Sequence, residues 1–287
     1  MSGSAAPPPL LELQDVAYAY APDIPALDGL SLAVEAGARV AILGPNGCGK
    51  STLLQILAGL RFPGRGAYRA FQRDITERAL SGTPFGMFFR KAVGIVFQNA
   101  EAQLFNASVE EEIAFGPRQL GEPEEAVRQR TEQLMALFGL RGLAGRPPFA
   151  LSGGEKRKVA LASVLVMDPA VLLLDEPTAG LDPRSTRLLV DLIVSQAAGR
   201  TAVTTTNELH IVPEIADRVL ILGEDRRLLA AGRPEDLLRD RALLRAANLV
   251  HRHRHAHEDG WHEHEHEHDS LVHWHRHEDA EKDPGGH

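Results

Sequence analysis

The chain has 287 residues, 44% of them hydrophobic, and its 31 basic and 39 acidic side chains give a net charge of −8. Residues 251–287 hold 12 of the 13 histidines, 10 of the acidic residues and 4 of the basic ones, so residues 1–250 carry a net charge of only −2. A body of that size can bury one sizeable core, which excludes collagen-like and disordered classes, and its near-neutral charge argues against nucleic acid as a partner because counterion release needs clustered Lys and Arg.

The N-terminal residues 1–9 predict a flexible segment without the basic start and apolar run of a secretory signal. The single cysteine, Cys48, cannot form an internal disulfide, which is typical of a cytosolic protein. The most apolar stretch, 159–174, is interrupted by Asp168 and Pro169 and falls short of the roughly 20 apolar residues that a membrane-spanning helix needs. We therefore expect a chain that does not cross a bilayer by itself.

Two segments near the N-terminus, 10–20 and 30–34, alternate apolar and polar residues and predict an antiparallel β lobe. Four later segments are short apolar or β-branched runs, typical of strands that helices cover on both faces. These runs are 39–43, 171–174, 201–205 and 219–222. They predict a central, mainly parallel sheet and hence an α/β fold.

Residues 122–140 carry apolar residues at helical spacing within a strongly charged sequence. This helix lies between two of the motifs described below, so we expect a helical subdomain inserted into the α/β core at about residues 100–165. We expect the folded domain over residues 10–250 and a disordered, histidine-rich tail over residues 251–287.

The segment GPNGCGKS follows the predicted strand 39–43 and satisfies the phosphate-loop pattern G-x-x-x-x-G-K-[ST]. Its glycines let successive backbone N–H groups and the following helix N-terminus point at phosphate oxygens. Lys50 adds a positive charge near the β- and γ-phosphates, and the Ser51 hydroxyl is a ligand for Mg²⁺. The predicted nucleotide-binding residues here are Gly44, Pro45, Asn46, Gly47, Cys48, Gly49, Lys50, Ser51 and Thr52. Kinases, GTPases and many ATPases share such a loop, so it predicts a P-loop NTPase core without fixing its task.

Residues 171–176 (VLLLDE) form an apolar strand that ends in two carboxylates, where the edge of a parallel sheet would meet the phosphates. Asp175 is placed to hold Mg²⁺ through water, and Glu176 to polarise the attacking water as general base. In isolation the pair could be solvated acids at a strand end. The phosphate loop favours the catalytic interpretation.

The segment LSGGE at 151–155 opens another helix, and its serine and glycines offer a hydroxyl and unobstructed backbone donors to an anion. A simple helix cap would have the same local pattern. It would not explain a second phosphate site in a chain whose own phosphate loop is complete.

With these motifs the chain resembles the ATP-binding subunits of ABC transporters from about residue 10 to residue 249. The resemblance implies an ATPase that uses ATP and Mg²⁺ and works as a dimer with a second ATPase subunit. In that dimer Ser152, Gly153 and Gly154 would reach the γ-phosphate held by the other subunit.

The resemblance also implies roles for three residues outside these motifs. Tyr20 matches the aromatic residue that stacks on adenine, and Asp182 matches the loop that communicates between the two sites. Gln98 matches the glutamine that senses Mg²⁺ and the membrane subunit. Taken singly, Tyr20 and Gln98 would be better interpreted as buried strand residues, and only their spacing within the set favours the site.

Residues 99–105 and 109–117 look like the region after this glutamine in energy-coupling-factor ATPases, which power cobalt, nickel and vitamin importers. The likeness implies a transmembrane coupling protein and a substrate-binding membrane component as partners, with this chain peripheral on the cytoplasmic face of the cell membrane. A polar connector is the alternative, but Phe105 and Phe115 would be ill suited to a freely solvated linker. We expect the surface of residues 98–117 to hold the coupling helices.

The sequence departs from the family where a histidine usually contacts the γ-phosphate. Asn207 stands there and can donate an amide hydrogen bond but carries no positive charge. Since a charged hydrogen bond is worth about 1 kcal/mol more than a neutral one, we expect hydrolysis slowed about tenfold. His210 would replace it only if the turn differed.

In the tail histidine alternates with Arg, Glu or Trp, so in extended backbone every second residue is histidine and projects to the same side. Neutral imidazole suits Ni²⁺, Co²⁺, Zn²⁺ and Cu²⁺. The predicted ligands are His251, His253, His255, His257, His262, His264, His266, His268, His273, His275 and His277. A solvated charged tail and an expression tag are the alternatives, although tags are usually unbroken histidine runs.

Together these patterns predict the ATP-hydrolysing subunit of a nickel or cobalt importer whose tail buffers the metal. A vitamin importer with an incidental tail is the alternative within the class. A soluble ABC ATPase of DNA repair or translation and a metal-storage protein with a regulatory nucleotide site are the alternatives outside it. Whether the second ATPase subunit is identical stays open.

Overall fold

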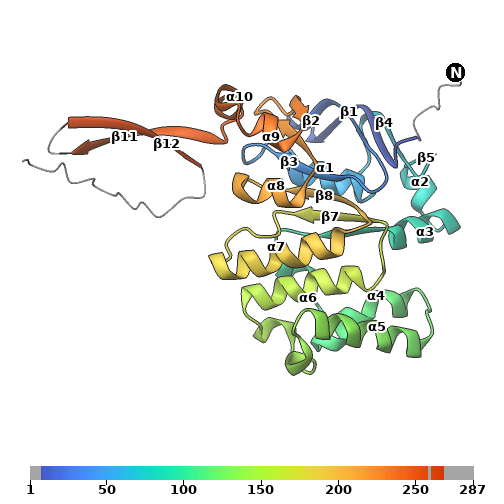
Figure 1. Ribbon diagram of the computed structural model, residues 1–287. Coiled ribbons are helices and arrows are strands. Elements are labelled where there is room, and N and C mark those ends of the chain that lie inside the picture. Colours follow the sequence, from blue (N-terminus) through green and yellow to red (C-terminus); the bar gives the residue numbers. More distant parts are fainter. Residues whose placement is uncertain (1–7, 258–259, 268–287) are drawn as a thin grey trace, which may run out of the picture.

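The computed structural model describes residues 8–257 and 260–267, with side chains for residues 8–250. Two sheets meet at the upper part of Figure 1, and the helices of the green segments form a separate layer below them. The predicted α/β class with an antiparallel lobe and a helical part is confirmed.

The smaller sheet is four-stranded with the order β2-β1-β4-β5. Its strands are β1 (Leu11–Ala21), β2 (Ile24–Val34), β4 (Arg65–Ala70) and β5 (Arg73–Asp74). All its pairings are antiparallel, and Leu11 and Leu13 of β1 are buried while Glu12 is not, as the alternating sequence predicts. The lobe is therefore a half-buried sheet whose apolar face turns to the core.

The larger sheet is six-stranded with the order β10-β9-β3-β8-β7-β6. Its strands are β3 (Arg39–Leu43), β6 (Val93–Val96), β7 (Val171–Asp175), β8 (Thr201–Thr205), β9 (Arg218–Leu222) and β10 (Leu228–Gly232). The neighbours from β9 to β6 are parallel, and β10 pairs antiparallel at the edge. Because the parallel strands all end on one side, that edge collects the residues that follow them.

The longer helices cover both faces of this sheet or stand beside it (Figure 1). The helices are α1 (Lys50–Leu57), α2 (Glu77–Leu80), α3 (Pro84–Ala92), α4 (Val109–Gln119), α5 (Glu124–Leu137), α6 (Gly153–Leu165), α7 (Pro183–Ala197), α8 (Val212–Ile215), α9 (Pro234–Leu237) and α10 (Arg241–Ala246). Short 3₁₀ segments are η1 (Ala100–Gln103), η2 (Arg141–Leu143), η3 (Pro148–Ala150) and η4 (Leu209–Ile211). The helix expected at 122–140 is α5, and with α4 and α6 it makes the helical part.

Three apolar clusters hold these layers together. The first joins the lobe to the large sheet through α1, whose Leu53, Leu54 and Leu57 are buried against both. The second lies between α6 and the β7 side of the sheet and includes Val109 and Ile113 of α4. The third packs α8 and α10 on the β9 side. The phosphate loop and the strand ends are thus fixed from several directions.

The backbone of β11 (Val250–His257) and β12 (Gly260–Glu267) forms an antiparallel pair that extends from the body in Figure 1. The sequence predicts a disordered tail here, whereas alternating residues also suit an extended strand. A lone two-stranded sheet is only marginally stable in water, so tail disorder stays a prediction. Residues 1–7, 258–259 and 268–287 lie outside the described residues.

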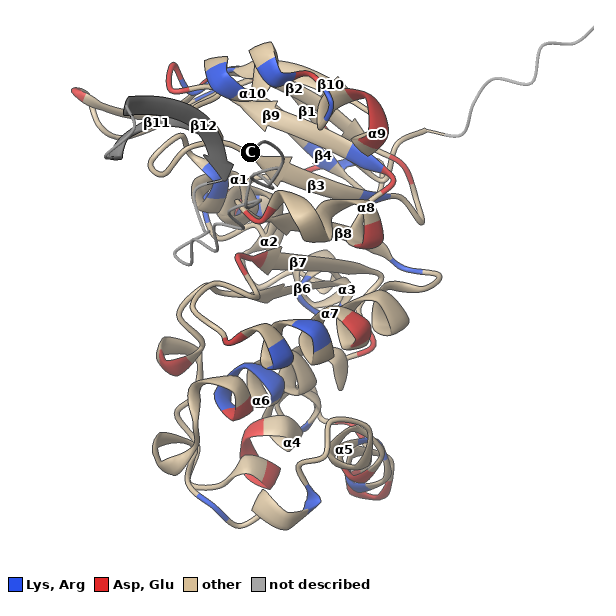
Figure 2. Ribbon diagram, turned by 60° about the vertical axis from the view of Figure 1, so that its left-hand side comes forward, with Lys and Arg blue, Asp and Glu red and all other residues tan. Residues whose placement is uncertain are grey.

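Lys and Arg are interspersed with Asp and Glu over the parts of the ribbon coloured in Figure 2. Within the described chain, no helix is long and apolar enough to cross a membrane.

Candidate active site

The phosphate loop turns from the end of β3 into α1, and its backbone is held close to the lobe. Gly49 has φ +103°, and a Cβ atom there would lie 2.3 Å from the Ala26 carbonyl oxygen of β2. Any side chain at this position would therefore clash with backbone as well as strain the left-handed conformation. The loop needs glycine here because the lobe packs directly against it.

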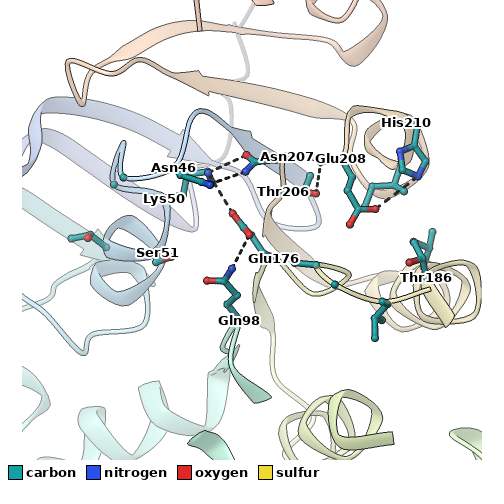
Figure 3. A pocket seen from close by; sticks show the side chains of 18 of the residues that line it. Asn46, Lys50, Ser51, Gln98, Glu176, Thr186, Thr206, Asn207, Glu208 and His210 are labelled. Carbon is teal, nitrogen blue, oxygen red and sulfur yellow. Dashed lines mark hydrogen bonds and ion pairs between the residues drawn. The ribbon is translucent and has the colours of Figure 1, made fainter. Parts of the chain in front are cut away.

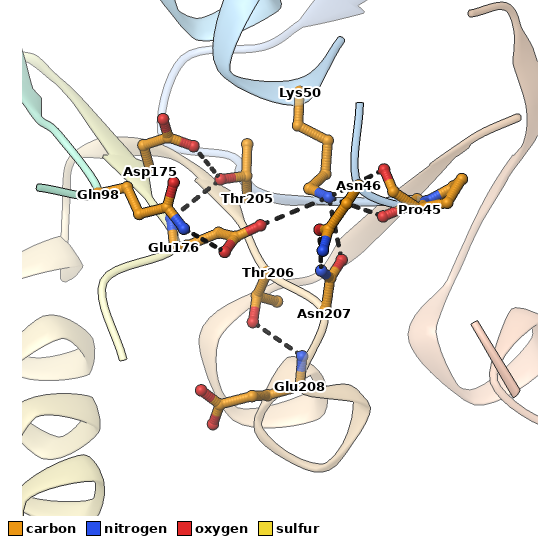
Figure 4. Close-up of polar contacts among 11 residues, drawn as sticks. Pro45, Asn46, Lys50, Gln98, Asp175, Glu176, Thr205, Thr206, Asn207 and Glu208 are labelled. Atoms are coloured by element: carbon orange, nitrogen blue, oxygen red, sulfur yellow. Dashed lines mark hydrogen bonds and ion pairs between the residues drawn. The ribbon is translucent and has the colours of Figure 1, made fainter. Parts of the chain in front are cut away.

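Lys50 is the centre of a polar network at the ends of β3, β7 and β8 (Figure 4). Its side chain is 5% exposed, and Nζ donates to the carbonyl oxygens of Gly44 at 2.7 Å and Pro45 at 3.3 Å. Nζ also donates to Oδ1 of Asn207 at 3.0 Å and lies 3.4 Å from Oε1 of Glu176. The buried ammonium is thus compensated by a carboxylate and by oxygens aimed at it, and a phosphate would compete for the same protons.

Asp175 and Glu176 end β7 and differ sharply in their surroundings. Asp175 is 5% exposed, and its Oδ1 accepts a hydrogen bond of 2.7 Å from the Thr205 hydroxyl of β8. The backbone N–H of Glu176 donates to the same hydroxyl oxygen at 3.0 Å. Glu176 has φ +43°, an uncommon conformation for glutamate that turns the chain off the strand. Thr205 therefore fixes both acids, a role that nothing in the local sequence indicates.

The Glu176 carboxylate points into the cavity with Gln98, which follows β6 (Figure 3). Nε2 of Gln98 donates to Oε2 of Glu176 at 2.9 Å. Gln98, Ser51 and Glu176 all line a cavity of about 1020 Å³, whereas Asp175 is not among its lining residues. These side chains offer hydroxyl, amide and carboxylate oxygens, the donor set that Mg²⁺ prefers. The predicted Mg²⁺ ligands Ser51 and Gln98 therefore fit the ion chemically, and contact of Asp175 with the ion through water stays a prediction.

Asn207, the residue at the predicted switch position, contacts the phosphate loop on two sides. Besides accepting from Lys50, its Nδ2 donates to Oδ1 of Asn46 at 3.1 Å. His210 lies away from this contact, 3.8 Å from Oε2 of Glu208 and with 65% of its side chain exposed (Figure 3). The geometry therefore favours Asn207 over His210 as the residue that faces the phosphates.

Tyr20 lies at the lobe end of the cavity, and its ring has a cation on it. The ring is half exposed, its hydroxyl is 2.9 Å from Oγ1 of Thr52, and the Arg61 guanidinium carbon lies 4.6 Å from the ring centroid. Arg61 is held there by a 2.8 Å hydrogen bond to the Tyr18 hydroxyl and by another to Gln55. Arg61 would support Tyr20 as a stacking platform for adenine.

The LSGGE residues lie apart from this cavity in their own chain. The Ser152 hydroxyl accepts from the backbone N–H of Glu155 at 3.4 Å, and the Glu155 carboxylate accepts from the backbone N–H of Ser152 at 2.8 Å, so the two form a capping box on α6. These hydrogen bonds from the backbone and hydroxyl of Ser152 hold the pKa of Glu155 below its usual range. Ser152, Gly153 and Gly154 are absent from the residues that line the described cavity. These residues therefore do not reach the phosphate loop of their own chain. Such a separation is required if they act in the site of a second subunit.

Asp182 caps α7, and its Oδ1 accepts from the backbone N–H groups of Arg184 and Ser185 at 3.1 Å each. The Ser185 hydroxyl and these N–H groups lower the pKa of the carboxyl. The neighbouring Leu181 and Pro183 line the cavity, so Asp182 lies at its rim. Its predicted role between two sites stays a prediction.

Sequence reasoning missed Arg157 on α6, which ties the helical part to the catalytic strand. Its guanidinium donates to the carbonyl oxygens of Glu176 at 3.2 Å and Pro177 at 2.5 Å, and also to that of Ala179. Burial lowers the pKa of Arg157. An arginine five residues after Ser152 in a charged helix start gives no sequence signal of this contact.

The predicted tail ligands cannot be assembled into a site from the described side chains. His251, His253, His255, His257, His262, His264 and His266 belong to β11 and β12, and His268, His273, His275 and His277 lie outside the described residues. Within the described side chains, no group of three or more His, Cys, Asp or Glu is arranged to hold a metal ion.

Three comparisons relate the chain to known proteins. The family described as ABC transporter matches residues 27–179. A nickel import ATP-binding protein, NikO of Rhodobacter capsulatus, is 49% identical over 246 residues, which cover 84% of this chain and 96% of that protein. An energy-coupling factor transporter ATP-binding protein, EcfA of Methanothermobacter thermautotrophicus, is 39% identical over 84% of this chain and 76% of that protein. The solved structure of cbiO1 from Clostridium perfringens, part of the ABC transporter complex cbiONQ, superposes with a TM-score of 0.72 at 35% identity and covers 85% of this chain and 96% of that one.

Replacing Arg61 with leucine tests the platform under Tyr20. Because the cation on the ring is lost while the apolar stem is kept, we expect affinity for ATP to fall about threefold. Affinity for inorganic tripolyphosphate, which has no adenine, should not change. Equilibrium competition binding measures both, and Arg61→Lys is the matched control that keeps the charge. An equal loss for ATP and tripolyphosphate would contradict the platform.

Proposed function

Because the chain belongs to the ABC transporter family, we propose that it is the ATP-hydrolysing subunit of a membrane importer for nickel or cobalt ions. Members of this family hydrolyse ATP. The observation that supports a metal ion as the transported substrate is the 49% identity with a nickel import ATP-binding protein along 96% of that protein's length. The similarity to an energy-coupling factor ATPase supports the same kind of importer. In this proposal the chain sits peripherally on the cytoplasmic face of the membrane.

The catalytic residues of the proposal are those around Lys50. Glu176 would activate water, Gln98 would bind the metal ion of the nucleotide and report its presence, and the network around Lys50 would orient the phosphates. The hydrogen bond of 2.9 Å between Gln98 and Glu176 supports this grouping. Mg²⁺, when bound, would supply positive charge to the phosphates.

The site would be completed by a second ATPase subunit. Ser152 caps the N-terminus of α6 and is exposed. This helix start carries a serine hydroxyl and two glycine N–H groups, and none of the three residues lines the cavity of its own chain. A helix N-terminus of this kind suits a phosphate. If each subunit contributes its residues 151–155 to the phosphate loop of the other, one ATP would lie at each of two interfaces.

The surface for the membrane partners would contain two exposed aromatic rings in the segment that follows Gln98. Phe105 is 67% exposed and packs edge-on against Phe115, with ring centroids 4.9 Å apart. The buried Glu112 carboxylate holds this loop, because one of its oxygens accepts from the backbone N–H groups of Phe105 at 2.8 Å and Asn106 at 2.7 Å. A loop held this firmly presents a preformed apolar surface, as the docking of a helix requires.

Replacing Phe105 with alanine tests that surface. We expect a folded protein with unchanged ATP affinity that co-purifies several-fold less with the transmembrane coupling protein, because the apolar contact is lost. Leu229→Ala removes an exposed apolar residue at the opposite edge of the large sheet and is the control. Undiminished co-purification of Phe105→Ala would place the contact elsewhere.

Asn207 would make hydrolysis slow without weakening ATP binding. Its amide reaches both Lys50 and Asn46, yet it supplies no charge to the phosphates. Replacing it with histidine should raise the hydrolysis rate about tenfold at unchanged ATP affinity. Single-turnover hydrolysis and equilibrium binding separate the two quantities. An unchanged rate in Asn207→His would count against this role.

The tail would buffer the transported metal. The backbone register opposes histidine to histidine in three places and arginine to glutamate in two. The histidine pairs are His251 with His266, His253 with His264 and His255 with His262, and the charged pairs are Arg252 with Glu265 and Arg254 with Glu263. Directly opposed residues share a face of an antiparallel pair, so the register supports a row of histidine positions on one face.

Uptake by membranes that contain the full importer tests cargo and tail together. We expect ATP-dependent uptake of Ni²⁺ or Co²⁺. Uptake of a vitamin instead would overturn the proposal that the importer carries a metal ion. Truncation after Val250 should reduce uptake at limiting metal and leave it unchanged at saturating metal. A full-length tail with every histidine replaced by asparagine is the matched variant and should behave like the truncation. If both variants take up limiting metal normally, the tail does not buffer it.

A further inference from the structure

The turn between β9 and β10 places an arginine where the backbone favours glycine. The N–H of Gly223 donates to the carbonyl oxygen of Arg227 at 2.9 Å, and the N–H of Arg226 donates to that of Gly223 at 3.0 Å. Residues 224–226 therefore form a three-residue hairpin loop, whose last residue adopts the left-handed conformation and is usually glycine. Arg226 stands there with φ +65°. A strained residue with a long cationic side chain is a candidate for function.

The fold brings this turn to the phosphate loop. β9 pairs parallel with β3, and Ile221 near its end lies opposite Leu43, the residue before the loop. The backbone N–H of Asp28 in β2 donates to the Arg226 carbonyl oxygen at 3.2 Å, which fixes the turn against the lobe. Arg226 consequently lines the nucleotide cavity together with Pro25, Asn46 and Gly47.

The Arg226 guanidinium lacks the partners that its neighbours have. Its Nε is buried and makes no hydrogen bond among the described residues. Asp28, whose backbone N–H binds the Arg226 carbonyl oxygen, has its carboxylate bound by Arg227, whose Nε lies 3.0 Å and whose second nitrogen lies 2.5 Å from Oδ2. Arg227 thus has a carboxylate partner, whereas the guanidinium of Arg226 has no ion-pair partner among the described residues.

The other cations of the cavity wall are already paired. Lys50 lies beside Glu176, and Arg187 binds the carboxylates of Glu214 and Asp191. A guanidinium without a partner is unfavourable when it is partly buried, and an anion bound in the cavity that Arg226 lines would give this side chain one. The ligand of this cavity carries its negative charge on phosphate groups, for which arginine offers a fork of donors.

We propose that Arg226 donates to a phosphate oxygen of the bound nucleotide and so adds a second fixed positive charge beside the phosphate loop. Arg226 follows β9, the neighbour of β3, and lines the same cavity as Asn46 and Gly47 of the phosphate loop. Lys50 acts from within the loop. The proposal depends on ATP binding and is independent of the metal cargo.

Replacing Arg226 with glycine tests this role without straining the turn. We expect affinity for ATP and for inorganic tripolyphosphate to fall about tenfold, because a charge-assisted hydrogen bond is lost. The melting temperature should stay equal or rise, because glycine adopts φ +65° without strain. Arg226→Lys should recover part of the affinity. Equilibrium competition binding and thermal unfolding give the two readouts.

Arg227→Gln is the matched control in the same turn. It removes the same charge and breaks the ion pair with Asp28, so it should lower the melting temperature slightly and leave both affinities unchanged. Wild-type ATP affinity in Arg226→Gly would overturn the proposal. Unchanged ATP affinity with loss of ATP-dependent dimerisation would also overturn it, because Arg226 would then contact the second subunit.

Discussion

The buried ammonium of Lys50 is the constraint on which the site depends. At 5% exposure the charge needs fixed partners, and they come from the ends of three neighbouring strands. Asn207, one of these partners, is 157 positions away in the sequence. A parallel sheet brings such distant residues together because its strands all end at one edge. The apolar clusters that hold β3, β7 and β8 in register therefore also set the positions of the charges.

Glu176 connects this charge to the helical part of the molecule. Its carboxylate contacts Lys50 on one side and Gln98 on the other, and its carbonyl oxygen accepts from Arg157 of α6. Gln98 continues into the loop that carries Phe105. A phosphate that drew Lys50 away from Glu176 would thus change the surroundings of Glu176. This residue directly contacts both Arg157 of the helical part and Gln98, which precedes the proposed partner surface. In the proposed function, this short chain of contacts would connect hydrolysis to the surface for the membrane partners.

The sequence predicted the parts of the site that depend on local chemistry. The phosphate loop, the two acids after an apolar strand and the capping segment at Ser152 are each contiguous, so their residue types and spacing carry the signal. The contacts of Arg61 and Thr205, and the place of Arg226 in the cavity wall, escaped prediction because they depend on which elements become neighbours. Thr205 belongs to a short strand rich in β-branched residues, and its hydroxyl reaches Asp175 only because β8 pairs with β7. The strand order was beyond reach for the same reason. The six segments expected as strands do form strands, whereas β4, β5, β6 and β10 were not predicted.

The two strands beside β3 deliver side chains of different charge to the two sides of the phosphate loop. Asn207 follows β8 and is neutral, and Arg226 follows β9 and is cationic. A charge that binds the phosphates equally before and during the reaction strengthens binding without lowering the barrier, whereas a charge at the γ-phosphate acts mainly on the rate. The proposed arrangement therefore favours tight ATP binding with slow turnover. In an importer that would hold the two subunits closed on ATP for longer in each cycle.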